Sequence, residues 1–184
     1  MTEATRILGI DPGSRVTGYG VVDTDGTTTR YVTSGCLRVG SGAFPDRLQQ
    51  IYAGIAALVG EHQPTDVAIE SVFVHKNADS ALKLGHARAA AICGTFGGGA
   101  ILHEYAAREI KQAVVGRGGA DKEQVQHMVK AILTLDALPV TDEADALAAA
   151  ICHAHSFRIK GEVLAGTAVG RRSGSRSSWR KFAG

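Results

Sequence analysis

Short apolar segments alternate with turn signals along the first forty residues. The segments 6–11, 16–23 and 31–38 have the length and composition of β-strands. Pro12-Gly13 marks a turn after the first segment, and Asp25-Gly26 after the second is typical of a tight hairpin. Three strands with such short connections predict an antiparallel meander.

Beyond this meander the apolar residues recur every three or four positions, which is the period of helices. Pro45 opens the first such stretch, in which Leu48, Ile51 and Ile55 fall on one face, and Pro64 ends it. Further strands are predicted at 67–70 and 100–104, and further helices at 78–96, 105–114, from Asp121 onward and at 142–157. This order predicts an α/β fold with a five-stranded mixed sheet flanked by helices, in which the first, fourth and fifth strands are parallel.

The charge distribution divides the chain into a body and a tail. The 184 residues carry a net charge of +2, but seven Lys and Arg residues stand against Glu162 alone after position 157. This stretch is also rich in Gly and Ser and cannot bury enough apolar surface to order itself. We therefore expect one domain over 1–157 and a basic, flexible tail over 158–184. An acidic body with a basic tail suggests an anionic partner.

The sequence contains no apolar run of membrane-spanning length and no segment typical of a secretory signal. Its cysteines, Cys36, Cys93 and Cys152, are odd in number, widely spaced and without a CxxC pair. This pattern is typical of reduced thiols, and it predicts a cytoplasmic protein that does not bind membranes.

Four carboxylates lie at the ends of predicted elements. Asp11 ends the first strand and Glu70 ends the fourth. If these parallel strands are neighbours, both side chains emerge at one edge of the sheet, where ligand sites in such folds commonly lie. Asp142 and Asp145 are three residues apart at the start of the last helix, and so they share one helix face.

A cluster of four carboxylates requires cations. Two like charges about 4 Å apart repel by about 4 kcal/mol at an effective dielectric constant of 20. Oxygen ligands with few histidines favour Mg²⁺ or Mn²⁺ over Zn²⁺. We expect two Mg²⁺ ions in this site, with Mn²⁺ as a substitute. Such a pair would act on a phosphodiester, one ion making the nucleophilic water and the other stabilising the leaving oxygen.

Each acid also has an explanation without catalysis. Asp11 precedes Pro-Gly, and Asp is common in turns. Asp142 would be favoured at the positive end of a helix dipole. Glu70 and Asp145 are harder to explain in this way, since Glu70 closes a buried strand and the helix around Asp145 is apolar nearly all round.

Six segments resemble the RuvC family of Holliday-junction resolvases, and they follow in the family's order across nearly the whole chain to about residue 157. They are GIDPGSRVTGYGVV at 9–22, IESVF at 69–73, KNADSALKLGHARA at 76–89, EYAAREIKQAVVG at 104–116, ADKEQVQHMV at 120–129 and DEADALAAAI at 142–151. The resemblance implies the ribonuclease-H-like fold. It also implies a crossover junction endodeoxyribonuclease, a homodimer that uses a divalent metal to nick two opposed strands of a four-way junction during recombination and repair.

The resemblance also implies roles for single residues and partners. The acids that are catalytic in the family's motifs correspond to Asp11, Glu70, Asp142 and Asp145, which makes them the expected metal ligands. Lys111 and Lys122 match basic positions of the catalytic site. The family further implies cooperation with the branch-migration proteins RuvA and RuvB.

Several residues are candidates for DNA contact. Phe73 follows Glu70 closely, and an aromatic side chain beside a catalytic edge can stack on bases. An ordinary core phenylalanine is the alternative, but the resemblance favours junction contact. Lys122 would begin a helix capped by Asp121, where backbone N–H groups favour anions; a solvated surface lysine is the alternative. The full set of expected DNA contacts is Phe73, Lys76, Asn77, Lys111, Arg117 and Lys122, with Arg15, Lys83 and Arg88 as further phosphate candidates.

Two other functions share parts of this pattern. Phosphotransferases of the actin and sugar-kinase type also open with a GID-x-G turn, but they need two such domains and about twice this length. A module that binds junctions without cutting them is the second alternative. Retention of four acids argues against it, because binding alone does not require negative charge facing phosphate. We also treat His153 as a packed or solvated residue of the last helix rather than a metal ligand.

Overall fold

A mixed sheet forms the centre of the molecule in the computed structural model, which describes residues 4–40, 42–71 and 77–169. Its strand order is β3-β2-β1-β4-β5. The first three strands pair antiparallel, whereas β1, β4 and β5 are parallel, so the predicted meander and the predicted parallel strands are both confirmed. The strands are β1 (Thr5–Asp11), β2 (Val16–Thr24), β3 (Thr29–Arg38), β4 (Asp66–Glu70) and β5 (Ile101–Tyr105).

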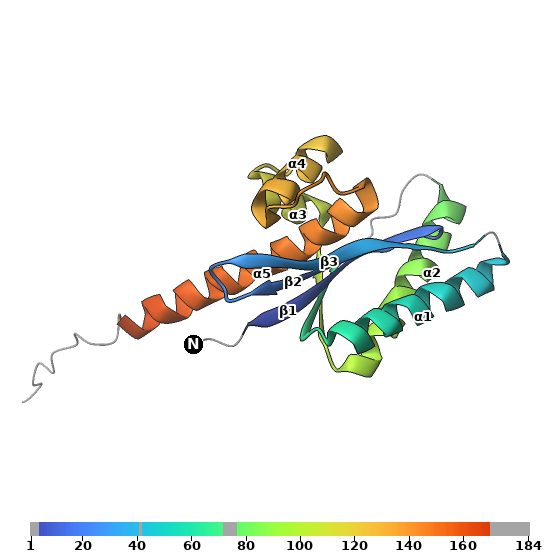
Figure 1. The fold of residues 1–184 in the computed structure, drawn as a ribbon, viewed down its shortest axis with the longest axis horizontal. Helices are drawn as coiled ribbons and strands as arrows, with labels where there is room; N and C mark the ends of the chain where they lie inside the picture. The colour runs from blue at the N-terminus through green and yellow to red at the C-terminus, as the bar shows by residue number, and fades with distance from the viewer. Residues whose placement is uncertain (1–3, 41, 72–76, 170–184) are drawn as a thin grey trace, which may run out of the picture.

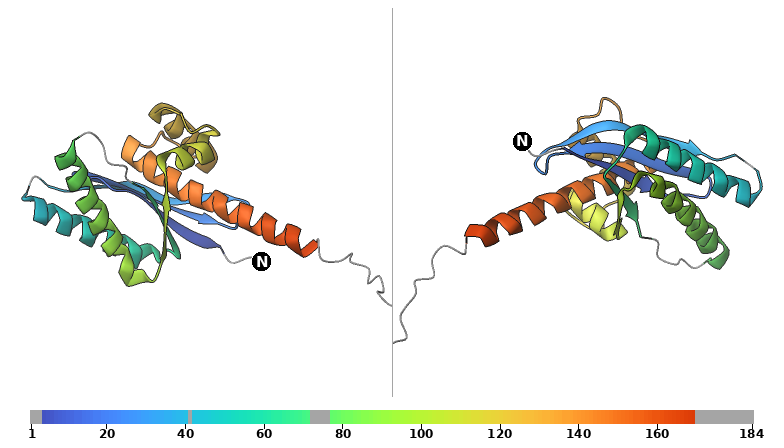
Figure 2. Two further views of the ribbon diagram at one scale, coloured as in Figure 1. Left: turned by 180° about the vertical axis from the view of Figure 1, so that it is seen from behind. Right: turned by 90° about the horizontal axis from the view of Figure 1, so that it is seen from below.

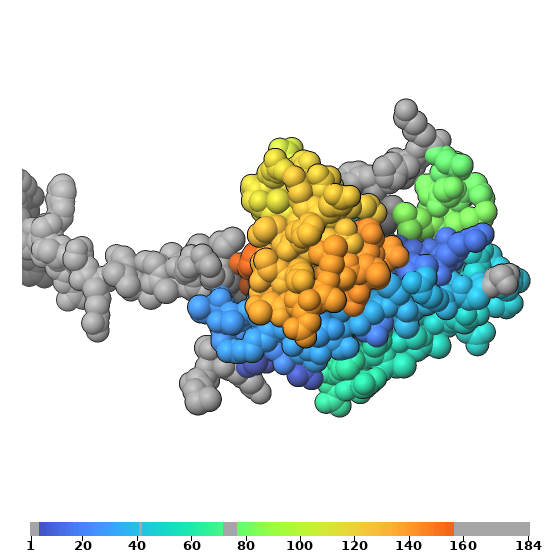
Figure 3. Space-filling view, turned by 45° about the horizontal axis from the view of Figure 1, so that its top comes forward, coloured from blue at the N-terminus to red at the C-terminus, as the bar shows by residue number. Residues whose placement is uncertain are grey.

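Helices cover both faces of this sheet (Figure 1). One face carries α1 (Phe44–His62) and α2 (Ala78–Thr95), and a 3₁₀ turn (Phe96–Gly98) follows α2; the other face carries α3 (Ala107–Val115), α4 (Lys122–Leu133) and α5 (Thr141–Val169). In Figure 3, α4 and the start of α5 form one prominence over the blue strands, and α2 forms another in green. Among the described residues, no helix is long and apolar enough to cross a membrane.

Alternating residues of the central strands pack into two separate hydrophobic cores, one on each face of the sheet. In β1, Ile7 packs with α3, α4 and α5, whereas Leu8 and Ile10 pack with α1 and α2. In β4, Ala68 faces α5 while its neighbours Val67 and Ile69 face the opposite way. Burial on both faces explains why these strands are almost continuously apolar in sequence.

Glycines allow α5 to lie directly on the sheet. A Cβ atom at Gly9 would overlap with the carbonyl oxygen of Ala146, and one at Gly18 would overlap with that of Asp142. The backbone of α5 therefore approaches β1 and β2 more closely than any side chain at these positions would permit. This contact sets the height of the first turns of α5 above the ends of the strands.

The last helix is longer than the sequence indicated. We expected it over 142–157, with a flexible tail from 158; instead α5 begins at Thr141 and continues to Val169, past the edge of the sheet (Figure 2). The added segment consists mostly of helix-compatible residues and contains no proline. Gly161 and Gly166 each oppose the helix by only about 1 kcal/mol. The beginning of the tail thus belongs to a helix, while the division into two domains stays a prediction.

Candidate active site

Two of the four predicted acids lie side by side at one edge of the sheet. Asp11 is the last residue of β1 and Glu70 is the last residue of β4. The two strands are parallel neighbours in which Ile10 pairs with Ile69, so the residues that follow emerge together. This arrangement confirms the expected neighbourhood of the strands.

The start of α5 brings a third acid to the same place. Asp11, Glu70 and Asp145 line one cavity of about 370 Å³, together with Lys111 from α3 and Lys122 from α4. Apolar walls complete the cavity; they are Ala107, Ile110 and Val125. Five of the six residues that we predicted for catalysis therefore share one cavity, although they come from five different elements.

The fourth acid lies beside this cavity rather than among its lining residues. Asp142 precedes Asp145 by one helical turn, and its backbone carbonyl rests against Gly18, which is paired with Asp11. Its charge still acts on the site, because it contributes to raising the pKa of both Asp11 and Asp145.

Burial and mutual repulsion make these acids weak. Burial is the main cause that raises the pKa of Asp11 to about 7, and the charges of Asp145, Glu70 and Asp142 add to it. The pKa values of Glu70 and Asp145 are also raised, again chiefly by burial. Neither the protein nor water fully stabilises the negative charge of these buried acids. A bound cation would do so, and the acids therefore favour one.

The protonation of Asp11 predicts a pH dependence in the metal-free protein. Its folded-state pKa lies above its value in the unfolded chain, so the folded state binds the proton more tightly. We expect stability in EDTA to fall as the pH rises from about 4 through about 7. Thermal unfolding at pH 5 and pH 8 measures this effect, and Asp11→Asn should reduce the difference between the two midpoints. Equal pH dependence in the variant and the wild type would contradict the assignment.

Two lysines offset part of the negative charge. Lys122 Nζ lies 3.7 Å from Asp145 Oδ2, and its side chain is 70% exposed, which leaves the ammonium group accessible to a ligand. Both Lys111 and Lys122 lower the pKa of Glu70 and of Asp145 against the effect of burial. The expected cap, Asp121, fixes the start of α4 in a capping box with Gln124. Asp121 Oδ1 accepts a hydrogen bond from the Gln124 N–H, and Gln124 Oε1 accepts one from the Asp121 N–H.

The donor set of the cavity suits a hard divalent cation. Among the described residues that line it, every possible anionic ligand is a carboxylate, and none is a histidine or cysteine. Such oxygen ligands are typical of Mg²⁺ and Mn²⁺ sites. The residues present therefore fit the expected metal.

The remaining predicted DNA contacts lie outside this cavity. Phe73 and Lys76 are outside the described residues. Asn77 caps α2, where its Oδ1 accepts a hydrogen bond from the Ser80 N–H at 3.2 Å, and Arg117 is exposed in the loop between α3 and α4. Their contact with DNA stays a prediction.

Arg88 has a different place from the one we expected. We named it a phosphate candidate, but its Nε donates a hydrogen bond to the backbone oxygen of Glu70 at 3.2 Å, and its Nη2 pairs with Glu104 at 2.7 Å. The guanidinium thus links α2 to the ends of β4 and β5. The sequence carried no signal for these contacts, because the partners are distant along the chain.

Comparisons with known proteins agree with this geometry. The family model described as "Crossover junction endodeoxyribonuclease RuvC" matches residues 7–153. A protein of that name from Chromohalobacter salexigens is 56% identical over 179 residues, which is 97% of this chain and 95% of the relative. Another from Marinobacter nauticus is 57% identical over 149 residues, which is 81% of this chain and 85% of the relative.

Solved structures with the same arrangement include two resolvases. The structure described as "T. thermophilus RuvC in complex with Holliday junction substrate" is 32% identical, with a TM-score of 0.79 over 85% of this chain and 96% of that one. The yeast mitochondrial Holliday junction resolvase Ydc2 has a TM-score of 0.65 at 9% identity, over 90% of this chain and 86% of that one. The second likeness concerns the fold alone, and it agrees with the expected ribonuclease-H-like class.

Proposed function

Because this chain belongs to the RuvC family of crossover junction endodeoxyribonucleases, it is a Holliday junction resolvase, and we propose that the acidic cavity between β1, β4 and α5 is where it cuts. The observation that carries this proposal is the convergence of Asp11, Glu70 and Asp145 with two lysines in one cavity. The reaction is hydrolysis of a phosphodiester in each of two opposed strands. Cleavage depends on a divalent metal, Mg²⁺ with Mn²⁺ as a substitute.

Carboxylates from three elements would hold the metal. Asp11, Glu70 and Asp145 line the cavity, and Asp142 lies beside it and adds negative charge. When bound, two ions supply a nucleophilic water and stabilise the leaving oxygen. The protein itself holds the acids at fixed spacing, since Asp11 and Glu70 extend from paired strands and Asp145 from a helix packed on those strands.

The two lysines would bind the phosphate that is cut. Lys111 and Lys122 place ammonium groups in the same cavity as the acids. Lys122 is also the first residue of α4, where the positive end of the helix dipole favours an anion. The scissile phosphate is therefore drawn toward the acids despite their negative charge.

Replacement of Lys122 by Gln should weaken both binding and cutting. Loss of one phosphate contact lowers the slope of junction affinity against salt by about 1, and loss of its charge beside the reacting group slows cleavage by about a hundredfold. Titrations at several salt concentrations and single-turnover cleavage measure these changes. Arg30→Gln is the matched control, because Arg30 is an exposed cation that pairs with Asp25 beside the turn between β2 and β3, at the end of the sheet opposite Asp11. An unchanged salt slope in Lys122→Gln would contradict the phosphate contact.

DNA outside the cavity would be held by residues around it. Phe73 and Lys76 follow Glu70 in the chain, Asn77 stands at the start of α2, and Arg117 is in the loop that precedes α4. Phe73, Lys76 and Asn77 follow Glu70 within seven residues of the sequence, and Arg117 precedes Lys122 by five, which supports their assignment to the junction arms.

The active form would be a homodimer with α2 at its centre. A four-way junction approaches two-fold symmetry, so a two-fold dimer presents two active sites to opposed strands. In the single chain α2 buries Ala87 and Ala91 against the core and leaves the opposite side exposed. That exposed side carries Leu82, which is 64% accessible, with Gly85 and Ala89, whose small size permits close approach.

Sedimentation tests the dimer. We expect a dimer at micromolar concentration and a monomer for Leu82→Glu, because a charge in the interface would be desolvated. Leu138→Glu is the matched control, since Leu138 is exposed in the loop between α4 and α5. A wild-type monomer would overturn this part of the proposal.

A synthetic four-way junction incubated with Mg²⁺ or with EDTA tests the function itself. We expect paired symmetric nicks with Mg²⁺, none with EDTA, and little cutting of linear duplex. Binding without nicks in Mg²⁺ would favour a module that only recognises junctions, and ATP hydrolysis without DNA would favour a phosphotransferase. Cooperation with RuvA and RuvB, and a cytoplasmic location, follow from the family and belong to the same proposal.

A further inference from the structure

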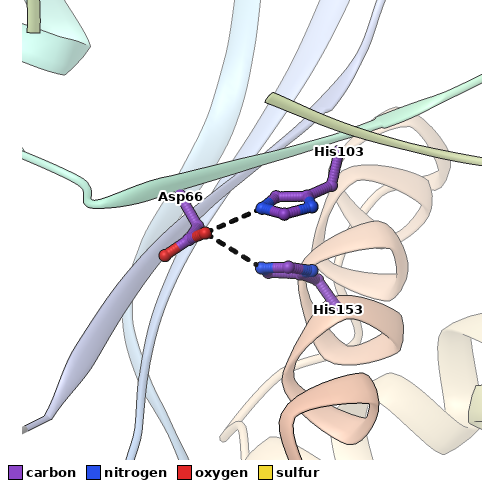
Figure 4. Close-up of side chains that lie close together, drawn as sticks. All are labelled: Asp66, His103 and His153. Atoms are coloured by element: carbon purple, nitrogen blue, oxygen red, sulfur yellow. Dashed lines mark hydrogen bonds and ion pairs between the residues drawn. The ribbon is translucent and has the colours of Figure 1, made fainter. Parts of the chain in front are cut away.

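A second group of metal-ligating side chains lies away from the acidic cavity. Asp66 begins β4, His103 lies in β5 and His153 lies in α5, and each offers a ligand atom within 4.8 Å of the others (Figure 4). Both imidazoles direct Nε2 at the same carboxylate oxygen. Asp66 Oδ1 lies 2.8 Å from Nε2 of His103 and 3.4 Å from Nε2 of His153.

This group is separate from the catalytic acids. Asp66 and Glu70 are at opposite ends of β4, which places them about 13 Å apart at the rise of a parallel strand. His153 follows Asp145 by eight residues of α5, or about 12 Å along a helix. None of the three residues lines the acidic cavity. The distances along β4 and along α5 thus agree that this group lies more than about 10 Å from the catalytic acids.

The ligand types differ from those of the acidic cavity. Two imidazole nitrogens and one carboxylate oxygen suit Zn²⁺ and related transition-metal ions rather than Mg²⁺. We propose that Asp66, His103 and His153 form a binding site for a divalent transition-metal ion, and that Zn²⁺ is the ion it binds. This site is independent of cleavage chemistry, and it would tie the start of β4 to β5 and α5.

The spacing of the ligands is close to what such an ion needs. Metal–ligand bonds of about 2.1 Å in a tetrahedral site place neighbouring ligand atoms about 3.4 Å apart. The His153–Asp66 distance already has this value, the His103–Asp66 distance of 2.8 Å is shorter by a fraction of an ångström, and the two imidazole ligand atoms lie within 4.8 Å of each other. The stacked rings, with centroids 4.0 Å apart, keep both nitrogens on one side of the site.

Neighbouring groups orient the ligands as they do in known metal sites. The hydroxyl of Tyr105 lies 2.6 Å from His153 Nδ1, which fixes that ring with Nε2 toward Asp66. Thr65 donates a hydrogen bond to Asp66 Oδ2 at 3.0 Å, which leaves Oδ1 for the ion. Partners of this kind typically change metal affinity by ten- to a hundredfold. His103, with 26% of its side chain exposed, provides access for the ion and for a water as fourth ligand.

Hydrogen bonding alone is the other explanation for the cluster. Asp66 Oδ1 can accept an N–H from each imidazole, and such a network would hold the same three elements together without an ion. The two explanations differ in what they predict for added metal. The network predicts no specific uptake, whereas the site predicts saturable binding of one ion that requires His103.

Titration of the full chain with Co²⁺ in place of Zn²⁺ tests the proposal. Cobalt bound by histidines in four- or five-coordinate geometry absorbs visible light strongly, whereas cobalt among six oxygens in the acidic cavity absorbs weakly. We expect a strong band that saturates at one ion per chain and that Zn²⁺ displaces. Absence of this band, or a band that Mg²⁺ displaces as readily as Zn²⁺, would overturn the proposal.

Variants assign the band to these residues. His103→Gln should abolish it, and Tyr105→Phe should weaken Co²⁺ affinity by about tenfold. His127→Gln, at an exposed position of α4, is the matched control and should leave the band unchanged, as should Asp145→Asn in the acidic cavity. Circular dichroism without metal checks that His103→Gln is folded. A folded His103→Gln that keeps the band would contradict the site, and this outcome is independent of whether the protein cuts junctions.

Discussion

Asp145→Asn should abolish junction cleavage while junction binding survives. Asp145 lines the acidic cavity, and its charge contributes to raising the pKa of both Asp11 and Glu70. The amide keeps the shape of the side chain but removes a negative metal ligand. A loss of about 4 kcal/mol of transition-state stabilisation corresponds to about a thousandfold slower cleavage. Single-turnover cleavage of a synthetic junction in Mg²⁺ measures the rate.

Binding serves as the internal control for this variant. Removing a negative charge near phosphate should leave junction affinity unchanged or increase it, which a gel-shift or fluorescence titration in EDTA would detect. Asp136→Asn, at an exposed position between α4 and α5, is the matched substitution and should cut at the wild-type rate. Wild-type cleavage by Asp145→Asn would refute its role as a metal ligand.

Gly18→Ala should have the largest effect on stability. Gly18 lies in β2 opposite Asp11, and a Cβ atom there would overlap with the backbone carbonyl of Asp142 at the start of α5. A backbone oxygen cannot rotate away as a side chain can, so the helix must move off the sheet. We expect a loss of about 3 kcal/mol in the free energy of unfolding.

Cleavage by Gly18→Ala should fall further than its stability alone explains. A displaced helix carries Asp142 and Asp145 away from Asp11 and Glu70, and loss of catalytic geometry reduces the rate even in folded protein. Denaturant unfolding and cleavage well below the unfolding midpoint separate the two effects. Gly60→Ala is the control, because nothing lies within 4 Å of its added Cβ in α1, and it should stabilise the helix by about 1 kcal/mol. A stable and fully active Gly18→Ala would contradict the close contact.

The fold was largely predictable because local signals and the apolar pattern agree. Pro-Gly and Asp-Gly turns separate the first strands, and in the second turn the Asp25 side chain accepts hydrogen bonds from the N–H groups of Thr27 and Thr28. The position of the acids was predictable for a related reason. A carboxylate that ends a buried parallel strand is directed to the sheet edge, so the order of the strands decides which acids meet.

Contacts between distant segments were not predictable. Arg88 reaches Glu70 and Glu104 because α2 packs beside β4, and no periodic pattern specifies that partner. His153 was expected to be either packed or solvated, and its 2% exposed side chain shows that it is packed. Its proximity to Asp66 and His103 was not predictable, because it depends on three elements meeting in space. The extension of α5 to Val169 was missed because composition alone suggested a tail.

The contacts between the strand glycines and the main chain of α5 also restrict which amino-acid substitutions this enzyme can accept. Where side chains separate two elements, a smaller residue on one can compensate a larger one on the other, and a core can be rebuilt step by step. At Gly9 and Gly18 the opposing atoms are carbonyl oxygens, which no substitution elsewhere can shorten. A library randomised at every codon should therefore yield active clones with several apolar residues at Ile7 or Leu147, which are buried in the core, but only glycine at Gly9 and Gly18.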